Sequence, residues 1–353
     1  MAHRNIFVKI LLMAFLLSLT LLTKAQHGGD NEPFNPGTFI LDHIGDAYEW
    51  HILTYNGHHV SVPLPVILYS TQSGFHTFMS SAFHHGSHNG FSIAADGPHK
   101  GKIVEQVADG SLVRPTLDLS ITKNVFAIFV SMTIIVWVFL SMAKVYKRRK
   151  GQAPKGLQSW VEPVVLFVRD DIARPAIGHQ YERFMPYLLT LFFFILINNL
   201  MGLIPIFAFG ANVTGNIAVT LVLAVLTFLI TTFNSTKTYW AHIFNTPGVP
   251  WWLKIPLPIM PFTELLGVIT KPFVLMIRLF ANITAGHIIA IGFFSLIFIF
   301  GGMTPVMGYG ASVISVLFTV FMTFLELLVA FIQAYVFTLL SALYFGMAIE
   351  EHH

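Results

Sequence analysis

Three ionisable side chains interrupt two long apolar stretches near the C-terminal end of the chain. Between residues 272 and 300 the side chains that readily carry charge are Arg278 and His287, and between residues 303 and 349 there is only Glu326. A charge at the centre of a bilayer costs at least ~2.5–3.5 kcal/mol, and such residues usually face a cavity or a partner. Arginine stays protonated in proteins, so Arg278 needs a carboxylate or water beside it. These three residues are therefore the first candidates for a functional site.

The helical spacing on the first stretch extends this set. Glu264, Lys271 and Arg278 are seven residues apart and share one helix face, which Asn282 continues at i+4. His287 lies nine residues after Arg278, about half a turn away from that face. Polar groups on the two sides of Arg278 therefore point in different directions, as two offset half-channels with Arg278 as the barrier would require.

The second stretch places its polar groups beside the first if the chain folds back at residue 304. Glu326 and Gln333 are seven residues apart and share a face. In this register Arg278 lies near Gln333, and His287 lies within about a turn and a half of Glu326. The sequence therefore predicts Arg278 with Gln333 at mid-depth and His287 with Glu326 on the outer side.

Each of these residues also has an ordinary structural interpretation. Arg278 could form an internal salt bridge with Glu326 or extend to the membrane interface, and Glu326 could be a protonated, buried carboxyl group. His287, Asn282 and Gln333 could form hydrogen bonds between packed helices. Glu264 and Lys271 could belong to a solvated helix end.

The segments that contain these residues have the composition and length of membrane spans. Hydrophobic residues make up 55% of the chain and charged residues 10%, against roughly 25% charged in soluble domains. We predict an all-α polytopic membrane protein with five transmembrane helices and one amphipathic surface helix at 158–168. The predicted spans are 125–143, 187–207, 216–233, 261–300 and 306–349. The last two, each about 40 residues or ~60 Å long, exceed a ~30 Å hydrocarbon core, which predicts a steeply tilted hairpin.

Charge placement predicts the orientation of these spans. Residues 1–25 have a basic start, a short apolar run and a Thr-Lys-Ala site, as in a signal peptide, although a retained anchor is the alternative. Nine Lys or Arg residues lie between residues 144 and 183, and none lies in 208–213 or 301–305. The positive-inside rule then places the N-terminal region outside and the C-terminus in the cytoplasm of a bacterial inner membrane.

Residues 26–120 form a predicted extracytoplasmic region ahead of the membrane domain at 121–353. The region holds ten of the sixteen His, and alternating stretches such as 60–69 predict a few short strands. A specific metal site is one interpretation of the His content, but a solvated His-rich segment explains it as well. The chain has no Cys, so thiolate metal sites and disulfides are excluded.

The residues from Lys271 to His287, KPFVLMIRLFANITAGH, closely resemble the signature of the a subunit of F-type ATP synthases. Gln333-Ala334, Met347-Ala348 and the segment NLMGLIP at 199–205 also resemble that family. The resemblance covers about residues 121–353. It implies a five-span fold packed against a ring of c subunits, with b subunits as stator partners and the remainder of the F1Fo ATP synthase attached.

The resemblance also implies residue roles. Arg278 matches the essential arginine that pairs with the carboxylate of each passing c subunit and blocks leakage between two half-channels. Asn282, Glu326 and Gln333 match outer half-channel positions. Glu264 and Lys271 match positions toward the cytoplasmic one. Many bacterial members have Glu where this chain has His287 and His where it has Glu326, an exchange that could preserve an acid–imidazole pair.

Several functions are not supported by the sequence. There is no P-loop and no Gly-rich dinucleotide turn, so we expect no nucleotide site, no cofactor, no nucleic-acid binding and no enzymatic activity of the chain by itself. A secondary transporter would favour inverted repeats with broken helices, which the sequence lacks. A structural scaffold would not need an arginine in mid-bilayer. The coupling ion is expected to be the proton, with Na⁺ as the alternative.

Overall fold

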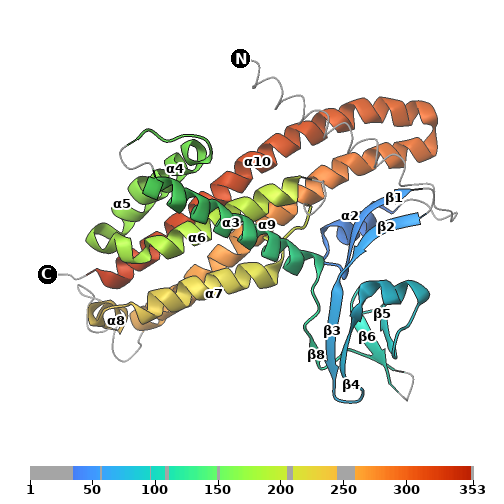
Figure 1. The fold of residues 1–353 in the computed structure, drawn as a ribbon, viewed down its shortest axis with the longest axis horizontal. Coiled ribbons are helices and arrows are strands. Elements are labelled where there is room, and N and C mark those ends of the chain that lie inside the picture. The colour runs from blue at the N-terminus through green and yellow to red at the C-terminus, as the bar shows by residue number, and fades with distance from the viewer. Residues whose placement is uncertain are drawn as a thin grey trace. The chain divides into compact units, whose positions relative to one another are not determined.

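The computed structural model describes most of the chain (Figure 1), which divides into two compact units. The described residues are 35–55, 58–95, 97–107, 111–148, 152–204, 210–244 and 259–350. The predicted signal peptide at 1–25 lies outside them. One unit comprises residues 1–129 and 204–211, and the other comprises the remainder.

The first unit contains a short helix and small antiparallel sheets. Its elements are α2 (Pro36–Ile44), β1 (Glu49–Tyr55), β2 (His58–Pro63), β3 (Pro65–Ser70), β4 (Gly74–Met79), a 3-10 turn (Ser80–His85), β5 (Phe91–Ile93), β6 (Ile103–Gln106), β7 (Leu112–Val113) and β8 (Leu117–Asp118). The described sheet orders are β1-β2, β4-β3-β8 and β5-β6-β7. The prediction of short strands at 60–69 is confirmed, and the term all-α is wrong for this region.

The core of this unit lies on the inner faces of β3, β5 and β6. Val66, Leu68, Phe91 and Ile103 are fully buried there. Tyr48 joins the cluster, and its hydroxyl donates a 2.5 Å hydrogen bond to Asp118 Oδ2 on β8. Burial, followed by the adjacent Asp118, raises the pKa of Tyr48 above its ordinary value. The small sheets therefore enclose a packed core with a neutral buried phenol.

The helical part of the chain begins with α3 (Lys123–Arg148), which starts in the first unit and continues into the second. The remaining helices are α4 (Leu157–Phe167), a π-helical turn (Val168–Ala173), α5 (Arg174–Ile177), a 3-10 turn (Gly178–Gln180), α6 (Tyr181–Leu203), α7 (Ile217–Phe233), α8 (Lys237–Phe244), α9 (Ile259–Met303) and α10 (Pro305–Ile349). Four described helical segments are long and apolar enough to cross a membrane, or five if the bent pair α7–α8 counts as one span.

Local sequence signals explain where these helices begin and end. Asn216 caps α7 by accepting a 3.0 Å hydrogen bond from the Ala218 N–H. Thr304 accepts from the Met307 N–H at 3.3 Å, with Pro305 at the first position of α10. Because Thr304 alone separates α9 from α10, the predicted reversal at residue 304 is confirmed.

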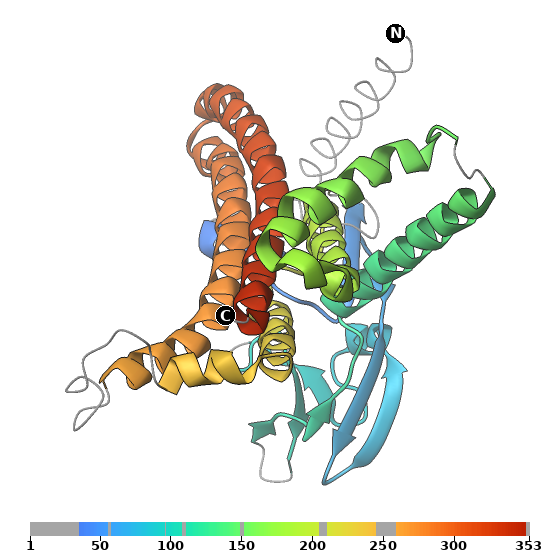
Figure 2. The ribbon, with the colours of Figure 1, turned by 90° about the vertical axis from the view of Figure 1, so that its left-hand side faces the viewer.

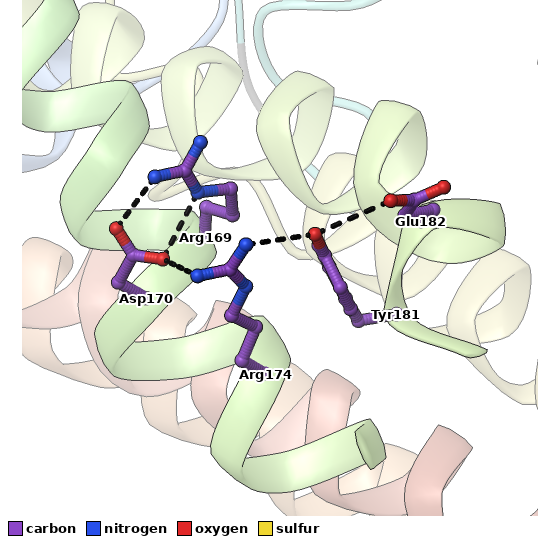
Figure 3. A network of polar contacts seen from close by, with 5 residues as sticks. All are labelled: Arg169, Asp170, Arg174, Tyr181 and Glu182. Carbon is purple, nitrogen blue, oxygen red and sulfur yellow. Dashed lines mark hydrogen bonds and ion pairs between the residues drawn. The ribbon is translucent and has the colours of Figure 1, made fainter. Parts of the chain in front are cut away.

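The segment between the first two predicted spans is more helical than expected. The predicted surface helix at 158–168 corresponds to α4, but the chain continues through the π turn and α5 to α6. Figure 3 shows the polar contacts around this turn: Asp170 accepts hydrogen bonds from Arg169 and Arg174, at 2.8–2.9 Å. Arg174 also donates to Tyr181 Oη at 3.1 Å. Pairing among these side chains stabilises the charged residues of the turn locally.

The two longest helices, α9 and α10, pack side by side as an antiparallel pair (Figures 1 and 2). Another face of α10 packs against α6. Small residues on α10, including Ala330, Ala334 and Ala342, are almost completely buried. Small side chains let helix backbones approach closely where lipid supplies no hydrophobic driving force.

The contact between α10 and α5 gives a stability prediction. A Cβ atom at Gly346 would overlap the backbone carbonyl oxygen of Ala176, which cannot rotate away as a side chain could. We expect Gly346→Ala to destabilise the folded chain by about 1–3 kcal/mol, the usual cost of overpacking. Thermal unfolding of the detergent-purified complex should show a lower midpoint for Gly346→Ala than for wild type.

Gly310 is the matched control because it lies on the same helix and a Cβ atom there meets nothing within 4 Å. Gly310→Ala should leave the midpoint unchanged or raise it slightly, because alanine favours helices by up to ~1 kcal/mol over glycine. Equal midpoints for Gly346→Ala and Gly310→Ala would show that α5 and α10 are not in tight contact.

Candidate functional site

His287 of α9 and Glu326 of α10 face each other across the helix pair. The His287 Nδ1 atom lies 3.8 Å from Glu326 Oε1, and the two side chains are 18% and 12% exposed. The absence of a side chain at Gly286 makes room for this arrangement, since a Cβ atom there would lie 2.8 Å from Glu326 Oε1. The antiparallel pairing thus joins an imidazole and a carboxyl group within the apolar helices.

A cavity of about 160 Å³ opens at this pair. Its polar lining comes from Asn199, Asn282, His287 and Glu326. The Oε1 atom of Glu326 is buried and has no hydrogen-bond partner among the described residues. Each water molecule takes up ~30 Å³ in the liquid, so the cavity can hold several water molecules that donate hydrogen bonds to this oxygen. The site is therefore suited to moving protons between water, imidazole and carboxyl groups.

Asn199 is a member of this cavity that the sequence analysis did not place in the site. Its amide donates to the Ala330 carbonyl at 3.2 Å, and its oxygen accepts a 2.5 Å hydrogen bond from Thr214 Oγ1. These bonds fix the side chain between α6 and α10. A buried asparagine in an apolar span was the signal available, because intramembrane polar residues usually have a specific role.

Arg278 lies on a different side of the helix pair from the buried polar groups. Its side chain is exposed, as are those of Val274, Ala281 and Asn282 on the same face of α9. Among the described residues, Arg278 forms no ion pair within 4.0 Å. The salt bridge of Arg278 with Glu326, considered from the sequence, is not formed, since Glu326 faces His287 instead. Water or a carboxylate outside the described residues is therefore what the guanidinium needs beside it.

Gln333 is buried, at 6% exposure, on the face of α10 that also carries Ala330 and Ala334. Among the described residues no hydrogen bond or ion pair joins Gln333 to Arg278, so the predicted pairing of these two residues at mid-depth stays a prediction. Gln333 is thus buried among packed helices, whereas Arg278 is exposed.

Lys271 lies at a second, smaller hollow, of about 20 Å³, between α7, α8, α9 and α10. Its ammonium group is 5.6 Å from the centroid of the Tyr344 ring, a cation–π contact. Thr231 and Tyr239 supply further hydroxyl groups to the lining. Glu264 is partly exposed and lies two helical turns earlier on α9. The residues that line this hollow differ from those that line the cavity at His287.

The His content of the N-terminal region forms no recognisable metal centre in the described part of the chain. No three His, Asp or Glu side chains there lie close enough to hold one ion. His84 instead lies 2.7 Å from Glu49, and His76 packs edge-on against Phe91. The side chains of His58 and His59 are outside the described set.

Comparison with known proteins gives matches to both parts of the chain. Residues 125–346 match the family model described as ATP synthase A chain, and residues 39–124 match one described as a domain of unknown function, DUF8433. The ATP synthase subunit a of Chloroherpeton thalassium is 44% identical over 244 residues, covering 67% of this chain and 69% of the relative. The ATP synthase subunit a 2 of Chlorobaculum tepidum is 48% identical over 237 residues, covering 65% of this chain and 64% of the relative.

Proposed function

This chain belongs to the ATP synthase A chain family, the proton-translocating stator subunits of the membrane-embedded Fo sector, and we propose that its protons follow two separate paths that meet at Arg278. The observation that carries this proposal is the exposed Arg278 on an apolar face of α9. An arginine at this depth cannot neutralise and forms no ion pair within the described chain. A carboxylate on a neighbouring, moving subunit is the partner that fits.

That neighbour would be the ring of c subunits. The face of α9 around Arg278 carries the small side chains Ala281 and Ala285, both exposed. Small residues allow a neighbouring helix to approach closely. The two helices of 45 residues each, about 68 Å long, would lie steeply tilted along the ring. Each ring carboxylate would pair with Arg278 in its ionised form and would become protonated on moving away.

The outer path would run through the cavity at His287 and Glu326. A proton arriving from water can be held by either group, and Asn282 on the same helix leads from the cavity toward the face of Arg278. Asn199 holds the cavity wall in place through its bonds to Thr214 and Ala330. Gln333, which is buried on α10, would support this path.

The inner path would pass the hollow at Lys271 and leave near Glu264. Hydroxyl groups of Thr231 and Tyr239 extend the polar lining in that direction. With Arg278 between the two paths, a proton could pass from one to the other only while bound to a carboxyl group of the rotating ring. This arrangement would couple proton flow to rotation and thus to ATP synthesis.

The proposed topology places this multi-pass membrane protein with five spans in a bacterial inner membrane. The bent pair α7–α8, with an angle of 101°, would contribute one span. The N-terminal unit would be extracytoplasmic and the C-terminus cytoplasmic, with α4 along the membrane surface. The b-subunit stator and the rest of the F1Fo complex would be its other partners.

The coupling ion can be tested with the purified complex in liposomes. ATP addition should acidify the lumen at the same rate in sodium-free medium and in medium with added sodium, because His287 and Glu326 offer proton-accepting groups. Acidification should also persist when an ionophore collapses any sodium gradient. Acidification that requires sodium, or ²²Na⁺ uptake driven directly by ATP, would contradict the proton path.

A further inference from the structure

The sheet β4-β3-β8 of the N-terminal unit is apolar on both faces. Its inner face carries Val66 and Leu68 of the core. Its outer face consists of three rows across the strands, set by the pairing register and by the backbone bonds of Leu119 and Ile121: Leu117–Tyr69–Phe75, Leu119–Ile67–Thr77 and Ile121–Pro65–Met79. We call these nine residues the outer sheet face.

This outer sheet face is unusual because most of it is exposed: Pro65, Ile67 and Ile121 are partly buried and the other six residues are exposed. Phe75 is 65% exposed and Leu119 is 59% exposed. None of the nine residues carries a charge. An antiparallel sheet with one face in water normally alternates between apolar and polar residues, whereas apolar residues on both faces indicate that both faces are covered. The outer sheet face therefore needs an apolar surface to rest on.

The outer sheet face is tied directly to the start of the first membrane span. Its edge residue Ile121 precedes Lys123, the first residue of α3, by two positions, so at most ~7 Å of chain separates them. The Ile121 N–H donates to the Pro65 carbonyl at 2.9 Å, and the Lys123 N–H donates to the Ala47 carbonyl at 2.8 Å. The sheet has no linker that would let it move away from the bilayer.

Side-chain contacts add to this attachment. The ring of Trp50 packs edge-on against Phe126 in the first turn of α3, with centroids 5.4 Å apart. The side chain of Asp46 accepts a hydrogen bond from the Asn124 N–H at 3.1 Å. The unit is thus fixed to the first turn of α3, and the chain that forms the edge of the outer sheet face runs directly into that helix.

We propose that the outer sheet face lies on the phospholipid surface from which α3 enters the membrane, with Phe75, Met79 and Leu119 in the headgroup–acyl boundary. Apolar faces of interfacial elements typically insert ~5–10 Å into this zone. Tyr69, with a ring and a hydroxyl, suits the same zone. The inference goes beyond proton translocation: it gives the N-terminal unit a lipid partner that braces the first span of the stator.

Spin labelling tests this directly, because the chain contains no native cysteine. Phe75→Cys and Leu119→Cys would each be labelled in the complete complex, whose other subunits carry no labelled cysteine, in phospholipid nanodiscs. Lys100→Cys, at an exposed turn between β5 and β6, is the matched control. The readout is the collision rate of the label with oxygen, which partitions into lipid, and with a nickel chelate, which stays in water.

Lipid contact predicts that oxygen collisions exceed nickel collisions severalfold at positions 75 and 119, with the reverse at position 100. A nickel-accessible label at positions 75 and 119 would overturn the proposal in favour of a solvated face. Exclusion of both reagents there would overturn it in favour of a protein partner. ATP-driven acidification is also measured on the same labelled samples. This second measurement distinguishes a failure of this proposal from a failure of the proposed proton path.

Discussion

Replacing Arg278 with alanine is expected to abolish both ATP-driven proton pumping and gradient-driven ATP synthesis while the complex still assembles. The guanidinium is exposed on α9 and forms no ion pair within the described chain, so its loss leaves no unpaired internal partner that would unfold the protein. In the proposed mechanism, the substitution would remove the charge that holds the ring carboxylate ionised and the barrier between the two proposed paths. Acidification of inverted vesicles by ATP, and ATP formation under an imposed gradient, are the two measurements.

Two further variants sharpen the result for Arg278. Arg278→Lys should also lose most of the activity, because a lysine lacks the planar fork and can release its proton in an apolar environment. Arg183→Ala is the control: Arg183 is an exposed arginine on α6 outside both paths, and its loss should change either rate by less than about twofold, as for most surface substitutions. Near-normal rates in Arg278→Ala would make Arg278 a packing residue.

The second large effect is expected at the His287–Glu326 pair. Glu326→Ala should lower proton pumping by roughly 10- to 100-fold, because positioned proton-transfer groups typically contribute 10²–10⁴-fold and water in the enlarged cavity replaces part of that. Glu326→Asp should retain more activity than Glu326→Ala, since it keeps a carboxyl group in the cavity. The initial rate of ATP-driven acidification, normalised to the amount of complex, is the measurement.

A steric variant tests the same pair without removing a titratable group. Gly286→Ala would place a Cβ atom 2.8 Å from Glu326 Oε1 and 3.1 Å from its Cγ, which forces the carboxyl group to move. Pumping should fall severalfold in Gly286→Ala but not in Gly292→Ala, where a Cβ atom on the same helix meets nothing within 4 Å. Equal rates in the two glycine variants would indicate that the position of Glu326 does not matter for transport.

The long helices and their reversal were predictable because each rests on local signals. The apolar stretches give α9 and α10, and Thr304 with Pro305 gives the turn between them. Once the turn is known, helical geometry brings His287 to within about a turn and a half of Glu326, and the structure places these side chains 3.8 Å apart. Periodicity on two rigid helices thus predicts contacts across a hairpin.

Other features depend on contacts that the sequence does not display. The helical path from Leu157 to Leu203 includes a π turn whose charges pair with one another, and charged residues alone had suggested a loop. Asn199 reaches the cavity only because α6 packs against α10, which periodicity within α6 cannot reveal. The short helix α8 was not predicted, since its eight residues are too few to give a clear helical period.

The N-terminal unit shows the same limit more strongly. Alternation predicted strands at 60–69, but pairing of β3 with β8 joins residues about 50 positions apart, such as Tyr69 and Leu117. Long-range pairing of this kind is decided by the fit of side chains across the sheet rather than by local preference. The apolar outer sheet face consequently emerged only from the strand register.

The most direct test of the central claim is the passive proton permeability of the membrane sector after the soluble ATP-hydrolysing sector has been removed. Vesicles with the wild-type chain should dissipate an imposed pH gradient rapidly, and vesicles with Glu326→Ala should do so much more slowly, near the rate of vesicles lacking the complex. That result would place the proton path through the cavity at His287 and Glu326. Equal rates for wild type and Glu326→Ala, with equal amounts of assembled complex, would contradict it.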